Sequence, residues 1–356
     1  MTPHATLARF REYLVGPSRF MTLLSCFELG IIDGLRATPD LSAQQLGEIA
    51  GARPEAVQQL LLLMVKEGFV AHDEQAGTYR LGSLADVEQK DLDAVLADLG
   101  MIKAVVLRQL YYLTQSVRAG SPVGLKELYG VDGDLYGALA GLPELREPWA
   151  KLMNTVTAHV DPWFFAHVDI PDGARVLDLA GNTGLGAIHT YRMKQSPGLH
   201  VTNFDLPEKE TESLANFRAH GVQDHCSFIG GDVFEKVPSG FDVVLIKHFL
   251  PMFDKNDVFR ILRAVHAALP PGGQAHALVP VFPEDLSDTE NYTVDFYPSF
   301  FIGAAMGQGG PQKLSTWAEW FTACGFTVTQ AVTDDPADLP PHALTVEAVV
   351  SAVKPA

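Results

Sequence analysis

Apolar residues recur at two different spacings along the chain, and the spacing changes near Asp172. Before this residue they repeat every three or four positions, as in the run Leu7–Leu35, and that repeat is typical of helices that bury one face. After it, short apolar runs alternate with segments of helix length. This alternation predicts a parallel, doubly wound α/β sheet in the second half of the chain.

The first hundred residues contain signals for short helices followed by a hairpin. Ser42 and Gln45 form a capping-box pattern that predicts the start of a helix. A leucine-rich helix is predicted over Pro54–Glu67, and two short strands over Phe69–Ala71 and Thr78–Leu81. Helix, helix and two-stranded wing together predict a winged-helix arrangement.

A winged helix raises the hypothesis of a DNA-binding regulator. A recognition helix carries basic and polar side chains toward the groove, but the helix Pro54–Glu67 offers only Lys66 near its end. A helix that is apolar all round is buried in a core or against another chain. We therefore expect this region to form a dimer and not to bind nucleic acid.

The predicted elements of the second half can be placed by residue. Strands are expected at Arg175–Leu179, His200–Phe204, Cys226–Gly230, Asp242–Lys247, Gln274–Pro280, Phe326–Ala331 and Val346–Ala352. Helices are expected at Ala187–Lys194, Lys209–His220, Asp254–Ala268 and Ser315–Cys324. Between the two halves, Asp91–Val168 is predicted to be helical and rich in aromatic residues.

A glycine-rich turn follows the first of these strands in the sequence VLDLAGNTGLG, Val176–Gly186. Glycines allow a ligand to approach the backbone closely, and ligands of open α/β sheets bind outside the carboxyl ends of the strands. The next predicted strand is followed by Asp205, at a position where an acidic residue binds the hydroxyls of a ribose. The pattern predicts a site for an adenosine-containing cofactor. The glycine spacing fits neither the dinucleotide fingerprint nor the phosphate loop.

The turn resembles the first motif of S-adenosylmethionine-dependent methyltransferases. The whole chain is similar to the small-molecule O-methyltransferases of plant caffeate and flavonoid metabolism and of bacterial antibiotic tailoring. The matches in the second half are Val176–Gly184, Phe204–Pro207, Gly230–Phe234, Lys247 and Leu269–Gly273. Those in the first half are Phe27–Asp33, Leu46–Ala50 and Leu60–Val70.

This resemblance implies a homodimer and three segments. Residues 1–95 would form a winged-helix-like dimerisation domain, and residues 96–168 a helical connector that contributes to the substrate cleft. Residues 169–356 would form a Rossmann-like domain that binds S-adenosylmethionine.

The resemblance also assigns cofactor-binding residues. Gly181 and its neighbours Asp178, Asn182 and Gly184 would admit the methionine end, although the family usually has glycine at Asn182. Asp205, beside Leu206, would bind the ribose, and Asp232 the adenine amino group. The remaining assignments are Val233 or Phe234 packing on adenine, Lys247 on the adenine side, and Thr157 and Met153 at the carboxylate and methyl ends.

The chain departs from the family at the catalytic histidine. Alignment on Lys247 puts that histidine at Pro251, which has no proton to exchange. His248 is either a displaced base or a packed, cofactor-side histidine. The residues expected to line the acceptor pocket are Trp163, Met252, Phe296, Tyr297, Phe300, Phe301 and Met306.

The missing histidine leaves several reactions open. Methyl transfer to a small aromatic or polyketide-like metabolite is expected, at oxygen by resemblance, or at carbon or nitrogen, which need less help from a base. Alternatives are a non-methylating use of the cofactor and a winged-helix regulator that senses a small molecule.

Composition narrows the partners further. The formal net charge is −17, which argues against nucleic acid and anionic membrane surfaces. The three cysteines, Cys26, Cys226 and Cys324, lack metal-ligand spacing, and no metal is expected. Neither a signal pattern nor an apolar run of membrane-spanning length is visible, so a cytoplasmic location is expected.

Overall fold

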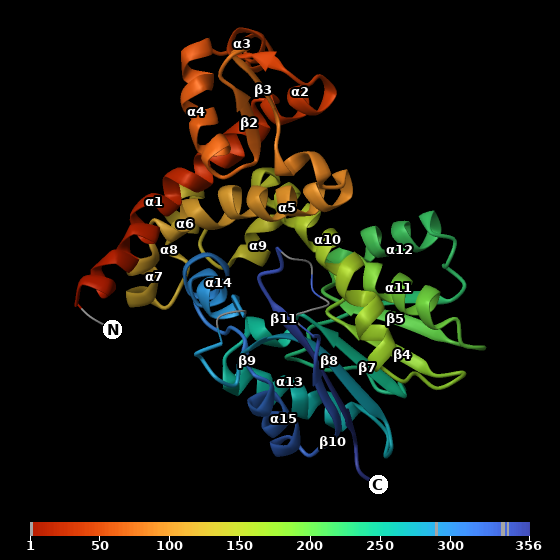
Figure 1. The fold of residues 1–356 in the computed structure, drawn as a ribbon. Coiled ribbons are helices and arrows are strands. Elements are labelled where there is room, and N and C mark those ends of the chain that lie inside the picture. Colours follow the sequence, from red (N-terminus) through yellow and green to blue (C-terminus); the bar gives the residue numbers. More distant parts are fainter. Residues whose placement is uncertain (1–2, 289–290, 336–338, 340–341) are drawn as a thin grey trace. The chain divides into compact units, whose positions relative to one another are not determined.

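The computed structural model describes residues 3–288, 291–335, 339 and 342–356. The chain forms two units that pack internally, Met1–Leu99 and Gly100–Ala356 (Figure 1). The predicted connector, residues 96–168, belongs almost entirely to the second unit.

The first unit combines four helices with a small antiparallel sheet. The helices are α1 (Pro3–Glu28), α2 (Ile31–Ala37), α3 (Ala43–Ala50) and α4 (Pro54–Lys66), and α5 (Gln89–Met101) crosses the unit boundary. The strands β1 (Leu41–Ser42), β2 (Val70–Asp73) and β3 (Thr78–Leu81) pair in the order β1-β3-β2. The expected order of helices and hairpin is present, with β1 as an additional strand.

Local sequence signals explain where these helices begin and end. Ser42 and Gln45 make both hydrogen bonds of the capping box at the start of α3. The expected helical run Leu7–Leu35 is broken, because Gly30 adopts a left-handed backbone (φ 69°) between α1 and α2. Gly68, also left-handed (φ 75°), follows the end of α4.

The leucine-rich helix α4 contributes to the core of its own unit. Val57, Leu61 and Met64 are fully buried there with residues of α2 and α3, whereas Leu62 on the opposite face is 62% exposed. The inner face of α4 is therefore not available to a second chain. Only its outer face, which carries Leu62, could contact a partner in the expected dimer.

The second unit is built on an eight-stranded sheet. Its order is β10-β11-β8-β7-β4-β5-β6, with β9 beside β8. The strands are β4 (Arg175–Leu179), β5 (His200–Asp205), β6 (Cys226–Gly230), β7 (Val243–Lys247), β8 (Gln274–Phe282), β9 (Gln312–Lys313), β10 (Thr327–Thr333) and β11 (Val346–Val353). All seven predicted strands are present. The predicted doubly wound sheet is confirmed, but the sheet is mixed and not parallel throughout, because β11 runs antiparallel to both of its neighbours.

Helices cover both faces of this sheet (Figure 1). On one face lie α10 (Pro143–His167), α11 (Leu185–Lys194) and α12 (Glu210–Ala219), with Phe164, Ile188 and Phe217 in the core. On the other lie α13 (Lys255–Ala268) and α15 (Leu314–Ala323), with Ile261 and Phe321 in the core. Because successive strand residues point to opposite faces, both cores draw on the same strands.

A third cluster of the second unit is purely helical. It contains α6 (Arg108–Leu110), α7 (Leu113–Ala119), α8 (Val123–Tyr129), α9 (Leu135–Leu139), α14 (Thr293–Phe300) and two π-helical segments, Ile102–Leu107 and Phe301–Ala305. The segment after β8 that carries the expected acceptor residues Phe296, Tyr297 and Phe300 is the helix α14, which was not among the predicted helices. Short 3₁₀ turns occupy Ser83–Asp86, Pro207–Lys209 and Leu250–Met252.

Within the described ranges, every helix is too short or too polar to cross a membrane.

Candidate cofactor and active site

The glycine-rich turn between β4 and α11 has an unusual backbone. Ala180 (φ 58°) and Asn182 (φ 50°) both adopt left-handed conformations, as does Gly184 (φ 80°). Asparagine tolerates this region better than most residues, which explains how Asn182 can stand where the family has glycine. The backbone N–H of Ala180 donates to the carbonyl of Phe204 at 2.8 Å, which fixes the turn to the end of β5.

Two buried oxygens lie against Gly181. They are Oδ2 of Asp178 and Oδ1 of Asn203, and neither has a hydrogen-bond partner among the residues that the structure describes. A Cβ at position 181 would collide with both, so only glycine fits. Burial raises the pKa of Asp178 to about 6. The two oxygens fill the space beside the Cα of Gly181, so the turn packs tightly on β4 and β5 at this point.

Asp205 stands at the end of the neighbouring strand, with each carboxylate oxygen anchored by one backbone N–H. Asn182 donates to Oδ2 at 2.8 Å, and Leu206 donates to Oδ1 at 2.7 Å. A carboxylate oxygen accepts more than one hydrogen bond, so this group can also receive two ribose hydroxyls. Burial raises the pKa of Asp205, although the two backbone bonds oppose the shift.

Asp232 follows the next strand, β6, and is held in a similar way. Its Oδ1 accepts the backbone N–H of Phe234 at 2.8 Å. The backbone N–H of Gly231 donates to the carbonyl of Asp205 at 2.9 Å. Asp205 and Asp232 therefore lie close together at the carboxyl ends of the neighbouring strands β5 and β6. A surface pocket of about 290 Å³ adjoins Asp232.

The apolar residues beside these acids differ in exposure. Leu206 is 44% exposed, which suits a residue that packs on a ligand. Val233 and Phe234 are partly buried against the core. The Phe234 ring contacts Phe253 edge-on and lies under the guanidinium of Arg260 at 4.7 Å.

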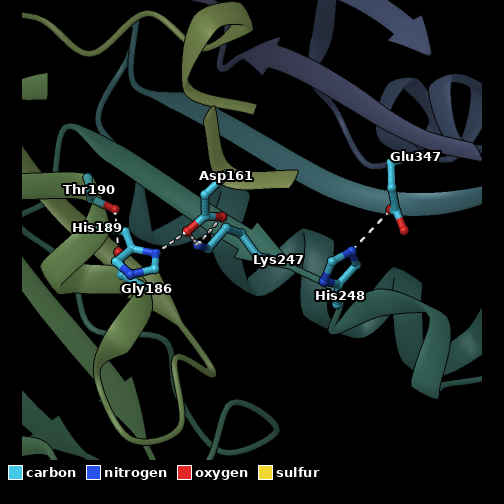
Figure 2. A network of polar contacts seen from close by, with 7 residues as sticks. All are labelled: Asp161, Gly186, His189, Thr190, Lys247, His248 and Glu347. Atoms are coloured by element: carbon cyan, nitrogen blue, oxygen red, sulfur yellow. Dashed lines mark hydrogen bonds and ion pairs between the residues drawn. The ribbon is translucent and has the colours of Figure 1, made fainter. Parts of the chain in front are cut away.

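A buried ion cluster lies behind the turn, and the sequence did not indicate it (Figure 2). Asp161 of α10 accepts hydrogen bonds from Nζ of Lys247 at 2.9 and 3.2 Å and contacts Nδ1 of His189 at 2.7 Å. Burial favours a higher pKa for Asp161, but the bonds from His189 and Lys247 outweigh it and hold the pKa below its ordinary value. Lys247, at the end of β7, is thus directed to α10.

The two predicted residues of α10 precede Asp161 on the same helix. Thr157 and Met153 lie four and eight residues before it, and both are half-buried. Residues four apart share one face of a helix. The side of α10 that carries Asp161 therefore also carries Thr157 and Met153.

Five of the predicted acceptor residues lie together. Phe300 and Phe301 are buried, and the ring of Phe300 stacks on Phe296 at 5.5 Å and on Trp149 at 6.0 Å. Tyr297 stacks on Phe301 at 5.7 Å. Met306 packs against the same cluster.

The other two predicted acceptor residues, Trp163 and Met252, lie outside the aromatic cluster of α14. Trp163 packs against the core on the sheet face that α11 covers, and the centre of its ring lies 4.7 Å from that of His167. Met252 lies in the 3₁₀ turn after β7, beside Pro251. The structure therefore does not join either residue to the aromatic cluster of α14.

The aligned position of the missing histidine is covered. Pro251 is buried, and its carbonyl accepts the backbone N–H of Gly310 at 2.7 Å. Three residues earlier, Nε2 of His248 lies 3.0 Å from Oε2 of Glu347, a buried residue of β11 (Figure 2). Glu347 was not predicted, because it lies in an otherwise apolar strand far along the chain.

Over the described part of the chain, histidine, cysteine, aspartate and glutamate nowhere form a group of three or more suited to holding a metal ion.

A Rossmann-like sheet, a glycine turn and two acids at consecutive strand ends define the class of S-adenosylmethionine-dependent methyltransferases. The family model of the O-methyltransferase domain matches residues 110–327, more than half of the chain. The chain belongs to this family. It is a methyltransferase, and S-adenosylmethionine is its cofactor.

Individual relatives agree with this assignment. The mitomycin biosynthesis 6-O-methyltransferase of Streptomyces lavendulae is 29% identical over 266 residues, which cover 73% of each chain. The L-tyrosine C(3)-methyltransferase of the same organism is 25% identical over 318 residues, 88% of this chain and 85% of that one. Among solved structures, the S-adenosylmethionine-dependent methyltransferase SibL has a TM-score of 0.78 at 22% identity, covering 98% of this chain and 100% of the other.

Proposed function

We propose that the enzyme transfers a methyl group to a small, flat, largely apolar metabolite of a secondary pathway. The observation that carries this is the cluster of stacked rings on α14, whose half-buried members Phe296 and Tyr297 offer flat apolar surface. Sites for small ligands are mostly apolar with a few placed polar groups. The names of the two relatives, which refer to mitomycin biosynthesis and to tyrosine, support an acceptor of this kind.

We infer that the cofactor lies along the carboxyl edge from β4 to β6. Asp205 would bind the ribose hydroxyls, Asp232 the adenine amino group, and Leu206 one face of the adenine ring. The bound cofactor supplies an electrophilic methyl group on a sulfonium. The backbone N–H groups that anchor both acids hold their carboxylates in place before the ligand arrives.

We infer that the methionine end lies over the glycine turn. Gly181 carries no side chain, so the cofactor can approach its backbone closely, and Thr157 and Met153 on α10 would face the carboxylate and methyl ends. Lys247 is engaged by Asp161, so its contribution would be to join α10 to the end of β7 and thereby keep these residues beside the turn.

We further propose that the enzyme is a homodimer that associates through its first unit. Helix α1 exposes large apolar side chains that its own unit leaves uncovered: Leu7 at 67%, Phe10 at 56%, Tyr13 at 78% and Leu14 at 77%. Contiguous exposed apolar surface marks interaction sites. The cytoplasm is the proposed compartment, in keeping with three free, buried cysteines.

The test is transfer of a labelled methyl group. The purified enzyme is incubated with S-adenosylmethionine carrying a ¹³C-methyl group and with a metabolite extract, and products are sought by mass spectrometry. A small aromatic product one labelled methyl group heavier is expected. Tight cofactor binding without any labelled product would favour the non-methylating alternative.

A further inference from the structure

The proposed function leaves the proton acceptor unassigned. A neutral hydroxyl must lose its proton during methylation, and a positioned base contributes roughly 10²–10⁴-fold to such a reaction. At the aligned position the backbone of Gly309 approaches Pro251 so closely that a Cβ on this glycine would collide with the proline carbonyl. The covering loop and the proline ring exclude a base there.

His248 is held from two sides at the carboxyl end of β7. Its backbone N–H donates to the carbonyl of Leu278 at 2.8 Å, and its ring is paired with Glu347. Its backbone is left-handed, with φ at 52°. Such a conformation is strained for a residue with a side chain, persists only where the surroundings enforce it, and is enriched at functional sites.

The carboxylate of Glu347 lies in an environment that disfavours a charge. It is 3% exposed, in a strand whose neighbours are almost all buried and apolar. A buried carboxylate is destabilising unless it is paired, and the side-chain partner recorded for it is His248. Its backbone N–H also donates to Oδ1 of Asp334 at 2.9 Å. Within the described ranges, the buried carboxylate of Glu347 therefore pairs with His248.

The pairing determines which ring nitrogen is available. An ionised carboxylate only accepts hydrogen bonds, so Nε2 of His248 carries the hydrogen. In the neutral ring the lone pair is then on Nδ1. The nearest cation along the chain, Lys247, is engaged by Asp161 and does not compete for Glu347.

The pair also lies beside the helix that carries the aromatic cluster. The backbone N–H of Val346, the residue before Glu347, makes a long hydrogen bond of 3.5 Å to Oγ1 of Thr293. Thr293 begins α14, which packs on β8. The side chains of Phe296 and Tyr297 follow within one turn. His248 and the aromatic residues of α14, which we propose contact the acceptor, therefore lie near the same edge of the sheet.

We propose that His248 is the general base of this enzyme for a hydroxyl acceptor, and that Glu347 is the residue that positions it. The inference rests on the proposed function. Nδ1 of His248 takes the hydroxyl proton as the acceptor oxygen bonds to the methyl carbon. The carbon–sulfur bond breaks with its electron pair left on sulfur, and the imidazolium releases its proton to water.

The first arm of the test examines the pair without turnover. Protein with ¹⁵N-labelled histidine is studied by NMR, and the His248→Asn spectrum identifies the resonances of His248. Asparagine is chosen because it tolerates the left-handed backbone. We expect Nε2 protonated and Nδ1 unprotonated in the wild type and in Glu347→Gln, which retains an acceptor. In Glu347→Leu the two tautomers should mix.

The second arm compares acceptors by ionisation. At pH 8, 2-naphthol is a neutral phenol, because ordinary phenols have a pKa of about 10, whereas pentafluorophenol is already ionised. We expect His248→Asn to lower kcat/KM for 2-naphthol by about 10²-fold or more and to change that for pentafluorophenol less than about threefold, because an ionised acceptor needs no base. Glu347→Gln should lose less than Glu347→Leu. The control His220→Asn, an exposed histidine at the end of α12, should change neither.

The possible results distinguish a wrong assignment of the base from a wrong proposed function. Equal losses for both phenols, or a wild-type His248 protonated on Nδ1, would overturn the assignment of the base. Binding of S-adenosylhomocysteine, measured by calorimetry, should be the same in all variants and shows that the cofactor site is intact. If the wild type binds it but methylates neither these phenols nor any extract component, the proposed function itself fails.

Discussion

Asp161 and Lys247 are 86 positions apart in the sequence, yet both carboxylate oxygens of Asp161 accept hydrogen bonds from Nζ of Lys247. Asp161 is 1% exposed, and the side chain of Lys247 is 11% exposed. The pair joins α10 to the end of β7, the two elements that flank the glycine turn. A buried pair of this kind tends to fix an arrangement more than it adds net stability.

Asp161→Asn should destabilise the second unit strongly. Removal of one partner leaves the Lys247 ammonium buried without a counter-charge, which typically costs about 3–5 kcal/mol. Urea unfolding followed by tryptophan fluorescence measures the change. The double variant Asp161→Leu, Lys247→Met should regain much of the loss, because it leaves no unpaired charge. Asp132→Asn, at an exposed ion pair with Lys126, should have no measurable effect, and an equally small effect at Asp161 would refute the interpretation.

Asp205→Ala should weaken cofactor binding. Two hydrogen bonds from ribose hydroxyls to a charged acceptor are lost, at roughly 1.5–3 kcal/mol, which corresponds to roughly tenfold to hundredfold in Kd. Titration calorimetry with S-adenosylhomocysteine measures it, with the exposed Asp224→Ala as the matched control. Wild-type affinity in a folded Asp205→Ala protein would show that the ribose lies elsewhere.

Asp334 should make stability fall as pH rises. Burial, and then the charge of Glu347, raises its pKa from 3.8 to about 7. Between these values the folded chain holds a proton that the unfolded chain releases, so the free energy of unfolding decreases with rising pH. Each unit of difference is worth about 1.4 kcal/mol.

Asp334→Asn should therefore act in a pH-dependent way. The amide resembles the protonated acid and can still accept the N–H of Glu347. We expect a higher melting temperature than wild type at pH 8 and an unchanged one at pH 4, measured by calorimetry in matched buffers. A shift of the same size at both pH values would exclude the linkage.

Leu14→Glu should separate the proposed dimer. A charge in the middle of the apolar surface of α1 must be desolvated on association, which opposes binding. Light scattering should give twice the chain mass of 38.7 kDa for the wild type and the chain mass for the variant. Arg11→Glu, an exposed change on the same helix, controls for added charge. A wild type that is monomeric at micromolar concentration would contradict the proposal.

The sequence predicted the elements that local patterns encode. Buried strands such as β4 and β7 are short apolar runs between turns, and their bounds agree with prediction to within a residue. The direction of β11 was not predictable, because a fully buried strand has the same apolar pattern in either direction. Helix α14 was missed because Pro298 and consecutive aromatic residues obscure the helical repeat.

The charged part of the site was hidden for a different reason. Asp161 lies in a helix and Glu347 in a strand, and neither is part of a local motif. Their partners, Lys247 and His248, are 86 and 99 positions away. Only the fold brings these charges together, so one sequence read alone gives no sign of either pair.

Together, the proposed function and the proposed base require methyl transfer to a hydroxyl oxygen of a small aromatic acceptor. The most direct measurement is the ¹³C NMR spectrum of the product isolated after reaction with cofactor labelled in the methyl group. We expect a single labelled methoxy resonance on an aromatic ring, strongly diminished when the enzyme is His248→Asn. A labelled methyl on carbon or nitrogen would contradict the role given to His248, and no labelled product would contradict the enzyme's proposed function.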